Sequence, residues 1–365
     1  MREQEKYMHR CLELAAGGLG STYPNPLVGC VIVHQGKIIG EGWHRKAGEA
    51  HAEVIAIDAV TDKALLEKSE LYVNLEPCSH YGRTPPCADL LVKMKIPRVF
   101  IGSLDYNSEV NGAGVARLER SGCQVTTGVL EKECRELNRR FFTFHLLKRP
   151  YVILKWAESA DGYIFPSEDQ VSEKGPVWIS NVYSRQLVHK WRAEEGAILV
   201  GTKTLEKDDP SLTVREVVGN SILRLVIDRR GRPNWDSKVF KDGFETVVLA
   251  QQSEEFRYIP EELKNNVRIN GLDFAASLPE QIVDFLYEEE VQSLIVEGGA
   301  LTLNAFIEAG LWDEARVFKG KIQFHEGLVA PELPSLPISE KSIGGDRLLF
   351  FRNDLEKQNF SIEKK

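Results

Sequence analysis

A histidine and two cysteines in the first quarter of the sequence have the side-chain types that bind zinc: His51, Cys78 and Cys87. Zn²⁺ prefers imidazole nitrogen and thiolate sulfur, and a site with three protein ligands leaves a fourth position for water. Such a water would lose a proton near neutral pH. Glu53, two residues after the histidine, could accept that proton and pass it on. These four residues therefore predict a zinc-activated hydrolytic reaction.

The order of these residues is typical of zinc-dependent deaminases, in which the glutamate of His-x-Glu is not a ligand. Eight residues separate Cys78 from Cys87, however, whereas the common pattern is Cys-x-x-Cys. The alternative is a closed structural site with four ligands, in which His44 or His80 would be the fourth. We favour the open, catalytic site, because His-x-Glu and Pro-Cys are both present.

The elements around these residues place them at helix starts and strand ends. His51 and Glu53 fall in the first turn of a predicted helix with one apolar face. Cys78 follows a buried strand, residues 71–75, and two prolines open the helix that carries Cys87. A helix N-terminus lowers the pKa of a cysteine, which favours the thiolate that binds zinc.

Strands and helices alternate through the first part of the chain, as expected for a layered α/β domain. Some segments repeat apolar residues at helical spacing, and others form short apolar runs. The basic pair before Pro150 marks the best domain boundary, so the first domain is predicted to span residues 1–149. The other expected helices are 3–17, 115–121 and 130–147, and the other expected strands are 28–33, 37–42, 99–101 and 124–126.

The second part, residues 150–365, shows the same alternation and predicts a second α/β domain. Short strands are also expected after about residue 313. The main expected strands are 151–156, 197–200, 223–227, 246–249 and 293–296, and the expected helices are 181–194, 281–287 and 301–308.

The composition limits the possible partners and compartments. A length of 365 residues suits two domains, and the net charge of −8 argues against nucleic-acid binding, which needs a basic surface. No apolar run is long enough to cross a membrane, and the charged N-terminus does not resemble a secretory signal. Six cysteines in a chain of this length favour the reducing cytoplasm over a disulfide framework.

Two segments of the second part could bind a polar ligand. Glu297-Gly298-Gly299 lies between a predicted strand and a predicted helix, where backbone N–H groups could meet a phosphate. It is not the Gly-x-Gly-x-x-Gly fingerprint, and a plain strand-to-helix turn explains its glycines equally well. The polar run Gly201–Arg215 follows a buried strand, and its residues suit a solvated loop as well as a binding loop.

Three longer motifs surround the zinc-binding candidates. They are Pro24-Asn25-Pro26-x-Val28-Gly29, Ala47-Gly48-Glu49-x-His51-Ala52-Glu53 and Leu75-Glu76-Pro77-Cys78-Ser79-His80-x-Gly82-x-Thr84-Pro85-Pro86-Cys87. They resemble the deaminase half of the bifunctional riboflavin-biosynthesis deaminase/reductase family, whose own pattern has the longer cysteine spacing. The resemblance implies a cytidine-deaminase-like three-layer domain that binds Zn²⁺. It also implies that Asn25 and His44 contact the substrate. His80 and Arg83 could contact its ribose or phosphate, or belong to a solvated loop.

The second part carries further motifs in the order of the same family's reductase half. They are Lys155-x-Ala157-x-Ser159-x-Asp161-Gly162, Trp178-Ile179-Ser180, Arg192-Ala193, the run Gly201–Arg215 and Val296-Glu297-Gly298-Gly299. The resemblance implies a dihydrofolate-reductase-like α/β domain that binds NADPH. Ala160 and Pro176 depart from the residues common among relatives. By resemblance, NADPH would be bound by Ala157, Trp178, Thr204, Asp208 and Gly299, and the phosphate-bearing substrate by Arg192, Leu212, Arg215 and Glu297.

We expect a cytoplasmic protein that forms a homo-oligomer. The resemblance implies that it acts on a small pyrimidine ribotide in riboflavin synthesis. The first domain would deaminate 2,5-diamino-6-(5-phosphoribosylamino)pyrimidin-4(3H)-one. The second would reduce the ribosyl chain to ribityl with NADPH, giving 5-amino-6-(5-phosphoribitylamino)uracil. A deaminase acting on RNA bases is the first alternative, and the acidic balance argues against it. A zinc-stabilised binding module is the second, and the intact Glu53 argues against that. No residue stands out as the proton donor of the reduction.

Overall fold

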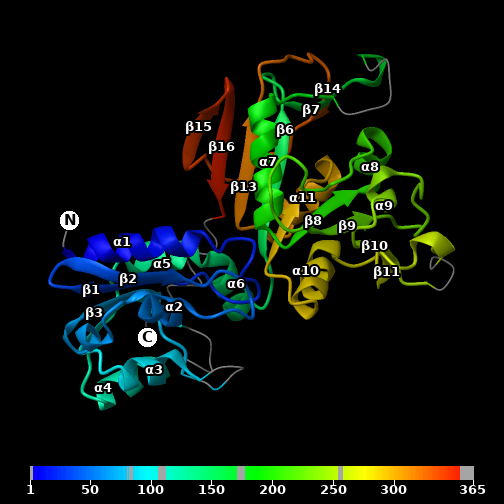
Figure 1. Ribbon diagram of the computed structural model, residues 1–365. Coiled ribbons are helices and arrows are strands. Elements are labelled where there is room, and N and C mark those ends of the chain that lie inside the picture. The colour runs from blue at the N-terminus through cyan, green and yellow to red at the C-terminus, as the bar shows by residue number, and fades with distance from the viewer. Residues whose placement is uncertain are drawn as a thin grey trace. The chain divides into compact units, whose positions relative to one another are not determined.

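The computed structural model describes residues 3–79, 81, 85–105, 112–170, 177–253 and 258–353. The chain divides into two compact units, Met1–Lys148 and Arg149–Lys365, one residue before the predicted boundary. Each unit is built around its own main β-sheet (Figure 1). Within the described ranges, no helix combines the length and the apolar character needed to cross a bilayer.

The first unit is centred on a five-stranded sheet with the order β2-β1-β3-β4-β5. β1 pairs antiparallel with β2 and β3, whereas β3, β4 and β5 run parallel. All five strands were predicted, with ends that differ by at most two residues. Their bounds are Gly29–His34 (β1), Lys37–Trp43 (β2), Glu70–Leu75 (β3), Arg98–Ser103 (β4) and Gln124–Thr126 (β5).

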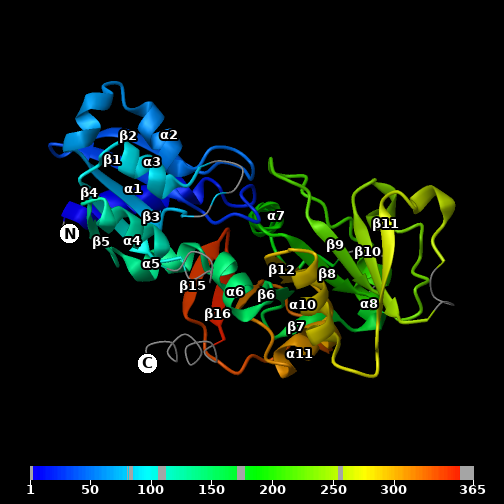
Figure 2. The ribbon, with the colours of Figure 1, turned by 90° about the horizontal axis from the view of Figure 1, so that it is seen from below.

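Helices cover both faces of this sheet and confirm the three-layer prediction (Figures 1 and 2). On one face, Leu91 of α3 and Leu118 of α4 belong to the same apolar cluster as Ile32 of β1. On the other face, Met8 of α1 joins the neighbouring residue Val31, because successive strand residues point to opposite sides. The helices are α1 Glu3–Ala16, α2 Ala52–Ala59, α3 Cys87–Lys93, α4 Ala113–Arg120, α5 Glu131–Leu137 and α6 Arg139–Leu147, with a 3₁₀ turn at Lys63–Lys68.

The single helix predicted over residues 130–147 is wrong, because Asn138 separates α5 from α6. Asn138 has φ −94° and ψ 18°. Its side chain accepts a hydrogen bond from the Leu27 N–H at 2.8 Å and donates one to the Leu27 carbonyl at 2.9 Å. The apolar spacing continues across this break, so periodicity alone could not reveal it.

The second unit has a nine-stranded sheet with the order β11-β10-β9-β8-β12-β6-β13-β16-β15. Neighbouring strands run parallel from β11 to β13. β16 pairs antiparallel with β13, and β15 pairs antiparallel with β16. β7 and β14 form a separate two-stranded sheet. The bounds are β6 Tyr151–Glu158, β7 Tyr163–Pro166, β8 Ala197–Gly201, β9 Leu223–Ile227, β10 Thr246–Gln251, β11 Val267–Leu272, β12 Ser293–Val296, β13 Glu314–Lys319, β14 Gly327–Val329, β15 Ser339–Ile343 and β16 Asp346–Arg352.

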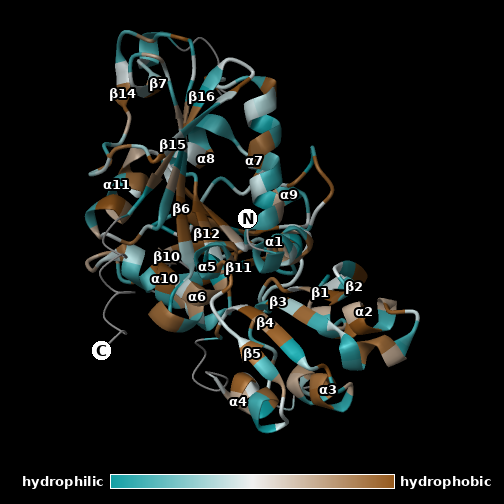
Figure 3. Ribbon diagram, turned by 90° about the vertical axis from the view of Figure 1, so that its left-hand side faces the viewer, coloured by the Kyte–Doolittle hydropathy of each residue, from teal (hydrophilic) through white to brown (hydrophobic). Residues whose placement is uncertain are grey.

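Helices again cover both faces of this sheet. Trp191 of α7, Leu205 of α8 and Phe240 of α9 share one apolar cluster, and Leu286 of α10 and Phe306 of α11 share the other. The central strands, such as β6 and β12, are strongly hydrophobic in Figure 3, whereas the helices carry both colours. The helices are α7 Val182–Glu194, α8 Thr202–Asp208, α9 Lys238–Lys241, α10 Leu278–Glu288 and α11 Ala300–Glu308, with 3₁₀ turns at Glu168–Gln170 and Glu261–Leu263.

The strand order of the second unit reverses around β12. The chain passes from β6 to β8 and only later inserts β12 between them. Because the three strands are parallel, their carboxyl ends meet at one edge of the sheet. Open α/β sheets bind ligands at such an edge. The segments that follow β8 and β12 contain most of the predicted reductase residues.

Candidate active sites

Three donor atoms of the first unit converge on one point. His51 is the N-cap of α2, Cys87 is the first residue of α3, and Cys78 follows β3. Their ligating atoms all lie within 4.8 Å of one another. His51 Nδ1 is 3.6 Å from Cys78 Sγ and 3.3 Å from Cys87 Sγ. One imidazole nitrogen and two sulfurs at this separation fit a zinc ion with one position left open.

The contact between the two thiols shifts their pKa values in opposite directions. It lowers the pKa of Cys78 and raises the pKa of Cys87, contrary to the lowering expected for Cys87 from its position at a helix start. The Cys87 backbone N–H also donates to Cys78 Sγ at 3.2 Å, which stabilises the Cys78 thiolate. Cys78 therefore supplies the anionic sulfur that a zinc site requires.

Glu53 lies in the first turn of α2 and is almost completely buried, with 3% of its surface exposed. Burial, together with the negative charge of Cys78, raises the pKa of its carboxyl group. A carboxyl group with a raised pKa can both accept and release a proton near neutral pH. Its position and environment suit a proton carrier.

Asn25 and His44 lie together beside the three donor atoms. His44 Nδ1 is 3.1 Å from the Ala50 carbonyl, which can only accept a hydrogen bond, so Nδ1 carries the proton. His44 Nε2 therefore accepts from the Asn25 amide at 3.0 Å. Burial lowers the pKa of His44, and its ring meets the ring of His51 edge-on at 5.5 Å between centroids. With both ring nitrogens engaged, His44 does not suit the role of a fourth zinc ligand.

Two further predictions for this site, His80 and Arg83, lie outside the described residues. A residue that the sequence did not single out is Glu76, which is 4% exposed. Its carboxylate accepts backbone hydrogen bonds from four N–H groups, at Asp105, Gly112, Gly114 and Val115, over 2.9–3.2 Å. The sequence signal was an acidic residue between a buried strand and Pro77. It could not reveal the role of Glu76, because the N–H groups that bind its carboxylate are distant in the sequence.

The second unit contains a buried ion cluster at the carboxyl ends of its central strands. Glu297, directly after β12, accepts two hydrogen bonds from the Arg192 guanidinium, at 2.8 and 3.2 Å. Lys155 of β6 lies 3.7 Å from the same carboxylate. Burial alone would raise the pKa of Glu297, but the charges of Arg192 and Lys155 outweigh it and hold the pKa at about 2. Glu297 is therefore ionised in this cluster.

Lys155 appeared in the sequence only as part of a motif, and the structure places it among the predicted site residues. Burial is the main cause that lowers the pKa of its amino group. The charge of Glu297 raises this pKa, and the charge of Arg192 lowers it. A lysine with a lowered pKa can release a proton more easily. The sequence signal was a single lysine directly after the apolar run Val152–Leu154.

Asp208, Thr204 and Gly299 lie next to this cluster and could face a cofactor. Burial raises the pKa of Asp208 to about 6, against the attraction of Lys207 and Lys155. Gly299 is the N-cap of α11, and a Cβ at Gly299 would lie 3.4 Å from Thr204 Oγ1. A Cβ at Gly298 would come within 2.7 Å of Thr302. Gly298 is therefore required by packing against Thr302, and the helix N-terminus at Gly299 is compatible with a cofactor phosphate.

The remaining predicted residues of the second unit lie in different environments, some buried and others exposed. Leu212 is buried in the cluster that covers the α7 face of the sheet, and Ala157 packs against that cluster. Arg215 is exposed and donates to Ser211 Oγ at 2.8 Å. Trp178 is 57% exposed and is stacked under the Arg185 guanidinium, 4.4 Å from the ring centroid. Within the described part of the chain, no hydrogen bond or ion pair joins Trp178 to the ion cluster. The run Gly201–Arg215, whose predicted structure was a loop, begins with helix α8.

Two family models match the chain. The zinc-binding region of cytidine and deoxycytidylate deaminases matches residues 1–103, and the RibD C-terminal domain matches residues 150–320. Among curated relatives, the riboflavin biosynthesis protein RibD of Aquifex aeolicus is 38% identical over 96% of this chain and 99% of its own length. RibD of Escherichia coli is 35% identical over 87% of each chain.

Solved structures are similar over nearly the whole length as well. One is a diaminohydroxyphosphoribosylaminopyrimidine deaminase/5-amino-6-(5-phosphoribosylamino)uracil reductase from Thermotoga maritima. It has a TM-score of 0.82 and 35% identity, with 96% of this chain and 98% of that chain covered. Another is RibD of Acinetobacter baumannii, with a TM-score of 0.83 and 31% identity, covering 96% of this chain and 99% of that chain. The similarity includes both units.

Proposed function

The chain belongs to the family of the riboflavin biosynthesis protein RibD, and we propose that its two domains catalyse successive steps on one pyrimidine ribotide. The first domain removes an amino group hydrolytically from the diaminopyrimidine ribotide, and the second reduces the ribosyl chain of the product to ribityl. The observation that carries the proposal is the convergence of His51, Cys78 and Cys87 beside the buried Glu53, in a chain with a second, separate ion-lined site.

In the deaminase domain, zinc would be held by His51, Cys78 and Cys87 and would supply the Lewis acid that activates water for attack on the ring carbon. Glu53 takes a proton on its carboxylate and delivers it to the departing amine, which its burial and raised pKa support. Ammonia leaves, and the carbonyl forms at the attacked carbon.

Asn25 and His44 bind the pyrimidine ring in this domain. His44 is neutral, with its proton on Nδ1, and its Nε2 holds one N–H of the Asn25 amide. The amide oxygen of Asn25 is thereby oriented to accept an N–H from the ring. This arrangement recognises a base edge through hydrogen bonds that do not depend on a charge.

In the reductase domain, NADPH would be held by Ala157, Trp178, Thr204, Asp208 and the turn at Gly299. NADPH supplies a hydride for C1′ of the ring-opened ribosylamine. Arg192, Leu212, Arg215 and Glu297 hold the substrate, and paired hydrogen bonds from arginines suit its phosphate. Reduction of a carbon–nitrogen double bond needs one proton besides the hydride. Lys155 is the candidate donor, because its buried amino group has a lowered pKa and lies beside Glu297.

We further propose that the protein acts in the cytoplasm on small molecules alone. Two thiols must stay reduced to bind zinc, and a reducing compartment meets that need. The net charge of −8 gives no support to nucleic-acid binding.

The decisive experiment follows both reactions in one sample of purified protein with measured zinc content. Incubated with the diaminopyrimidine ribotide alone, the protein should release ammonia and stop. Addition of NADPH should then cause its oxidation, in an amount equal to the ammonia already released. NADPH oxidation without prior ammonia release would contradict the proposed order. A protein that holds zinc but releases no ammonia would contradict the deaminase assignment.

A further inference from the structure

The loop that carries Leu212 and Arg215 has an unfavourable backbone. Leu212 has φ 55°, in the left-handed region that disfavours residues other than glycine, and yet its side chain is 2% exposed. Asp209, at the end of α8, has φ 40°. Residues in such conformations persist only where the surrounding contacts hold them. The contacts around this loop therefore decide where its side chains point.

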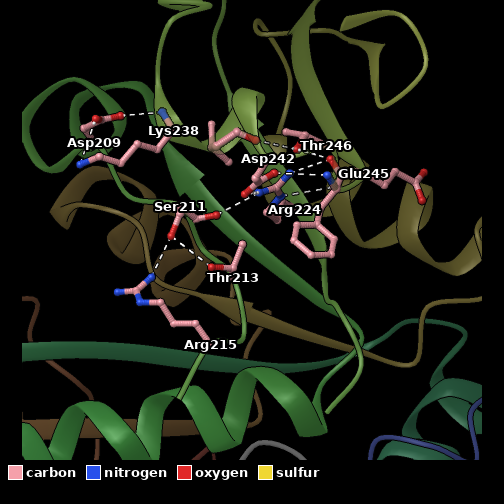
Figure 4. A network of polar contacts seen from close by, with 11 residues as sticks. Asp209, Ser211, Thr213, Arg215, Arg224, Lys238, Asp242, Glu245 and Thr246 are labelled. Atoms are coloured by element: carbon pink, nitrogen blue, oxygen red, sulfur yellow. Dashed lines mark hydrogen bonds and ion pairs between the residues drawn. The ribbon is translucent and has the colours of Figure 1, made fainter. Parts of the chain in front are cut away.

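One of those contacts comes from Arg224 of β9, which is 1% exposed (Figure 4). Its Nη1 donates to the Ser211 carbonyl at 3.0 Å and to Asp242 Oδ2 at 2.7 Å. Its Nη2 donates to the Phe244 carbonyl at 2.6 Å, and its Nε lies 3.5 Å from the Glu245 carbonyl. The buried guanidinium thus joins the loop to the turn before β10.

Ser211 transmits this contact to Arg215. Its carbonyl accepts from Arg224, and its hydroxyl accepts from Arg215 Nη1 at 2.8 Å. The same hydroxyl lies 3.2 Å from Thr213 Oγ1. Figure 4 shows these links as a continuous series from the buried arginine to the exposed one. The direction of the Arg215 side chain therefore depends on where Arg224 holds Ser211.

Packing holds only part of the loop. Leu212 is buried in the apolar cluster on the α7 face of the sheet, but a small open pocket of about 70 Å³ lies beside the loop, lined by Leu212, Thr213 and Val214 and by Arg224 and Phe244. Where the pocket opens, side chains do not enclose the loop, and the hydrogen bonds of Arg224 join it to the turn before β10.

We propose that Arg224 is a positioning residue for substrate binding in the reductase domain. It holds Ser211, and through Ser211 it orients Arg215 toward the phosphate of the substrate. The inference rests on the proposed function in one respect, namely that Arg215 binds that phosphate. Arginine suits the position because its planar group presents five N–H donors in a fixed geometry, whereas lysine presents one compact charge. Asp242 compensates the buried charge.

The test compares Arg215→Ala, Ser211→Ala, Arg224→Lys and Arg224→Met in steady-state reductase assays with the deaminated ribotide. A lost charge-assisted hydrogen bond to phosphate should raise the KM of Arg215→Ala for the ribotide by about 30-fold. Ser211→Ala and Arg224→Met should raise it by about 10-fold, and Arg224→Lys should lie between wild type and Arg224→Met. The kcat and the dissociation constant for NADPH should change by less than about twofold in Ser211→Ala.

Because Arg224 is buried, Arg224→Met can fail to fold, and Ser211→Ala keeps the proposal testable in that case. NADPH binding, followed by its fluorescence, reports whether the reductase domain of each variant is folded. Arg347→Met is the control, because Arg347 pairs with Glu340 on the exposed edge formed by β15 and β16. Its KM should equal that of wild type.

A double-variant cycle separates positioning from general destabilisation. If Ser211 acts through Arg215, then Ser211→Ala combined with Arg215→Ala should have the KM of Arg215→Ala alone. Effects that multiply would overturn the inference, as would an unchanged KM in both Ser211→Ala and Arg224→Lys while Arg215→Ala is impaired. An unchanged KM in Arg215→Ala would instead show that the substrate assignment itself is wrong.

Discussion

The two candidate sites differ in how much of the chain builds them. The zinc-binding candidates lie between His51 and Cys87, at the first turns of α2 and α3 and just after β3. The reductase candidates are distributed from Lys155 to Gly299, on one strand, two helices and three loops. The first site is a local motif supported by neighbouring elements, whereas the second exists only when distant strands pair.

The two sites also differ in their electrostatics. In the deaminase site, burial and a neighbouring thiolate raise the pKa of Glu53, so the carboxyl group can exchange protons. In the reductase site, Arg192 and Lys155 hold the pKa of Glu297 at about 2, so the carboxylate remains ionised and acts as a fixed anchor. The comparison teaches that two buried glutamates take opposite roles according to the charges that surround them.

The largest effect is expected from Glu53→Gln, which removes the proton carrier and retains the shape of the side chain. Deamination should fall by about 10³-fold, because general acid–base catalysis contributes that order of rate. Zinc content, measured by atomic absorption, and reduction of the deaminated ribotide should be unchanged. Glu49→Gln is the matched control, since Glu49 is exposed just before α2. If Glu53→Gln deaminated at the wild-type rate, Glu53 would not be the proton carrier, and its contrast with Glu297 would be wrong.

A smaller effect is expected from Arg192→Met, which leaves Glu297 buried with Lys155 as its remaining cation. The free energy of unfolding of the second domain should fall by about 3 kcal/mol, because an uncompensated buried charge is costly. Chemical denaturation measures it. Lys190→Met, on the same helix, removes only an exposed pair with Glu194 and should cost less than about 0.5 kcal/mol.

The double variant Arg192→Met/Glu297→Leu sharpens this prediction. Removal of both charges should restore most of the lost stability, because a buried ion pair is often replaceable by apolar side chains. Ribotide reduction should remain impaired, since both groups are proposed to bind the substrate. Equal stabilities of the single and the double variant would argue that Glu297 is not held as a buried anion.

The third effect concerns Asp208, whose pKa burial raises to about 6 in the folded state, above the ordinary aspartate value of 3.8. Between these values the folded state binds more protons than the unfolded state, so stability falls as the pH rises from about 4 to 6 and stays lower above 6. Asp208→Asn should therefore be more stable than wild type by about 2 kcal/mol at pH 7, after allowance for partial exposure. Denaturation curves at pH 4 and pH 7 test this, and a constant difference would contradict it.

The smallest effect is expected from Glu76→Gln. One of its carboxylate oxygens becomes an amide NH₂ group, which cannot accept the two N–H groups that this oxygen bonds. Thermal unfolding should show a loss of about 1 kcal/mol in the first domain. Deamination should decline while zinc remains bound. Glu67→Gln, in an exposed pair with Lys95, is the control, and an equal loss in both variants would argue against a special role for Glu76.

The sequence predicted the elements of the first domain well, apart from the break at Asn138. In the second domain it missed β11, because Asn270-Gly271 is typical of a turn and not of a strand. It also missed α8, because the polar residues of Thr202–Asp208 leave only Leu205 buried, which gives a short helix little apolar periodicity. Pairing with β10 fixes β11, and packing against β8 and β9 fixes α8.

The sequence alone identified the candidates His51, Glu53, Cys78 and Cys87. Their residue types and spacing indicate their chemistry, and they lie at the ends of helices and strands that the sequence predicts. The tertiary structure decided what distance in the chain concealed. It brought Lys155 to Glu297, set four backbone N–H groups around Glu76, and placed Arg224 beneath the loop of Arg215. Each of these contacts joins residues whose proximity depends on how the chain folds, and a one-dimensional pattern carries no such distance.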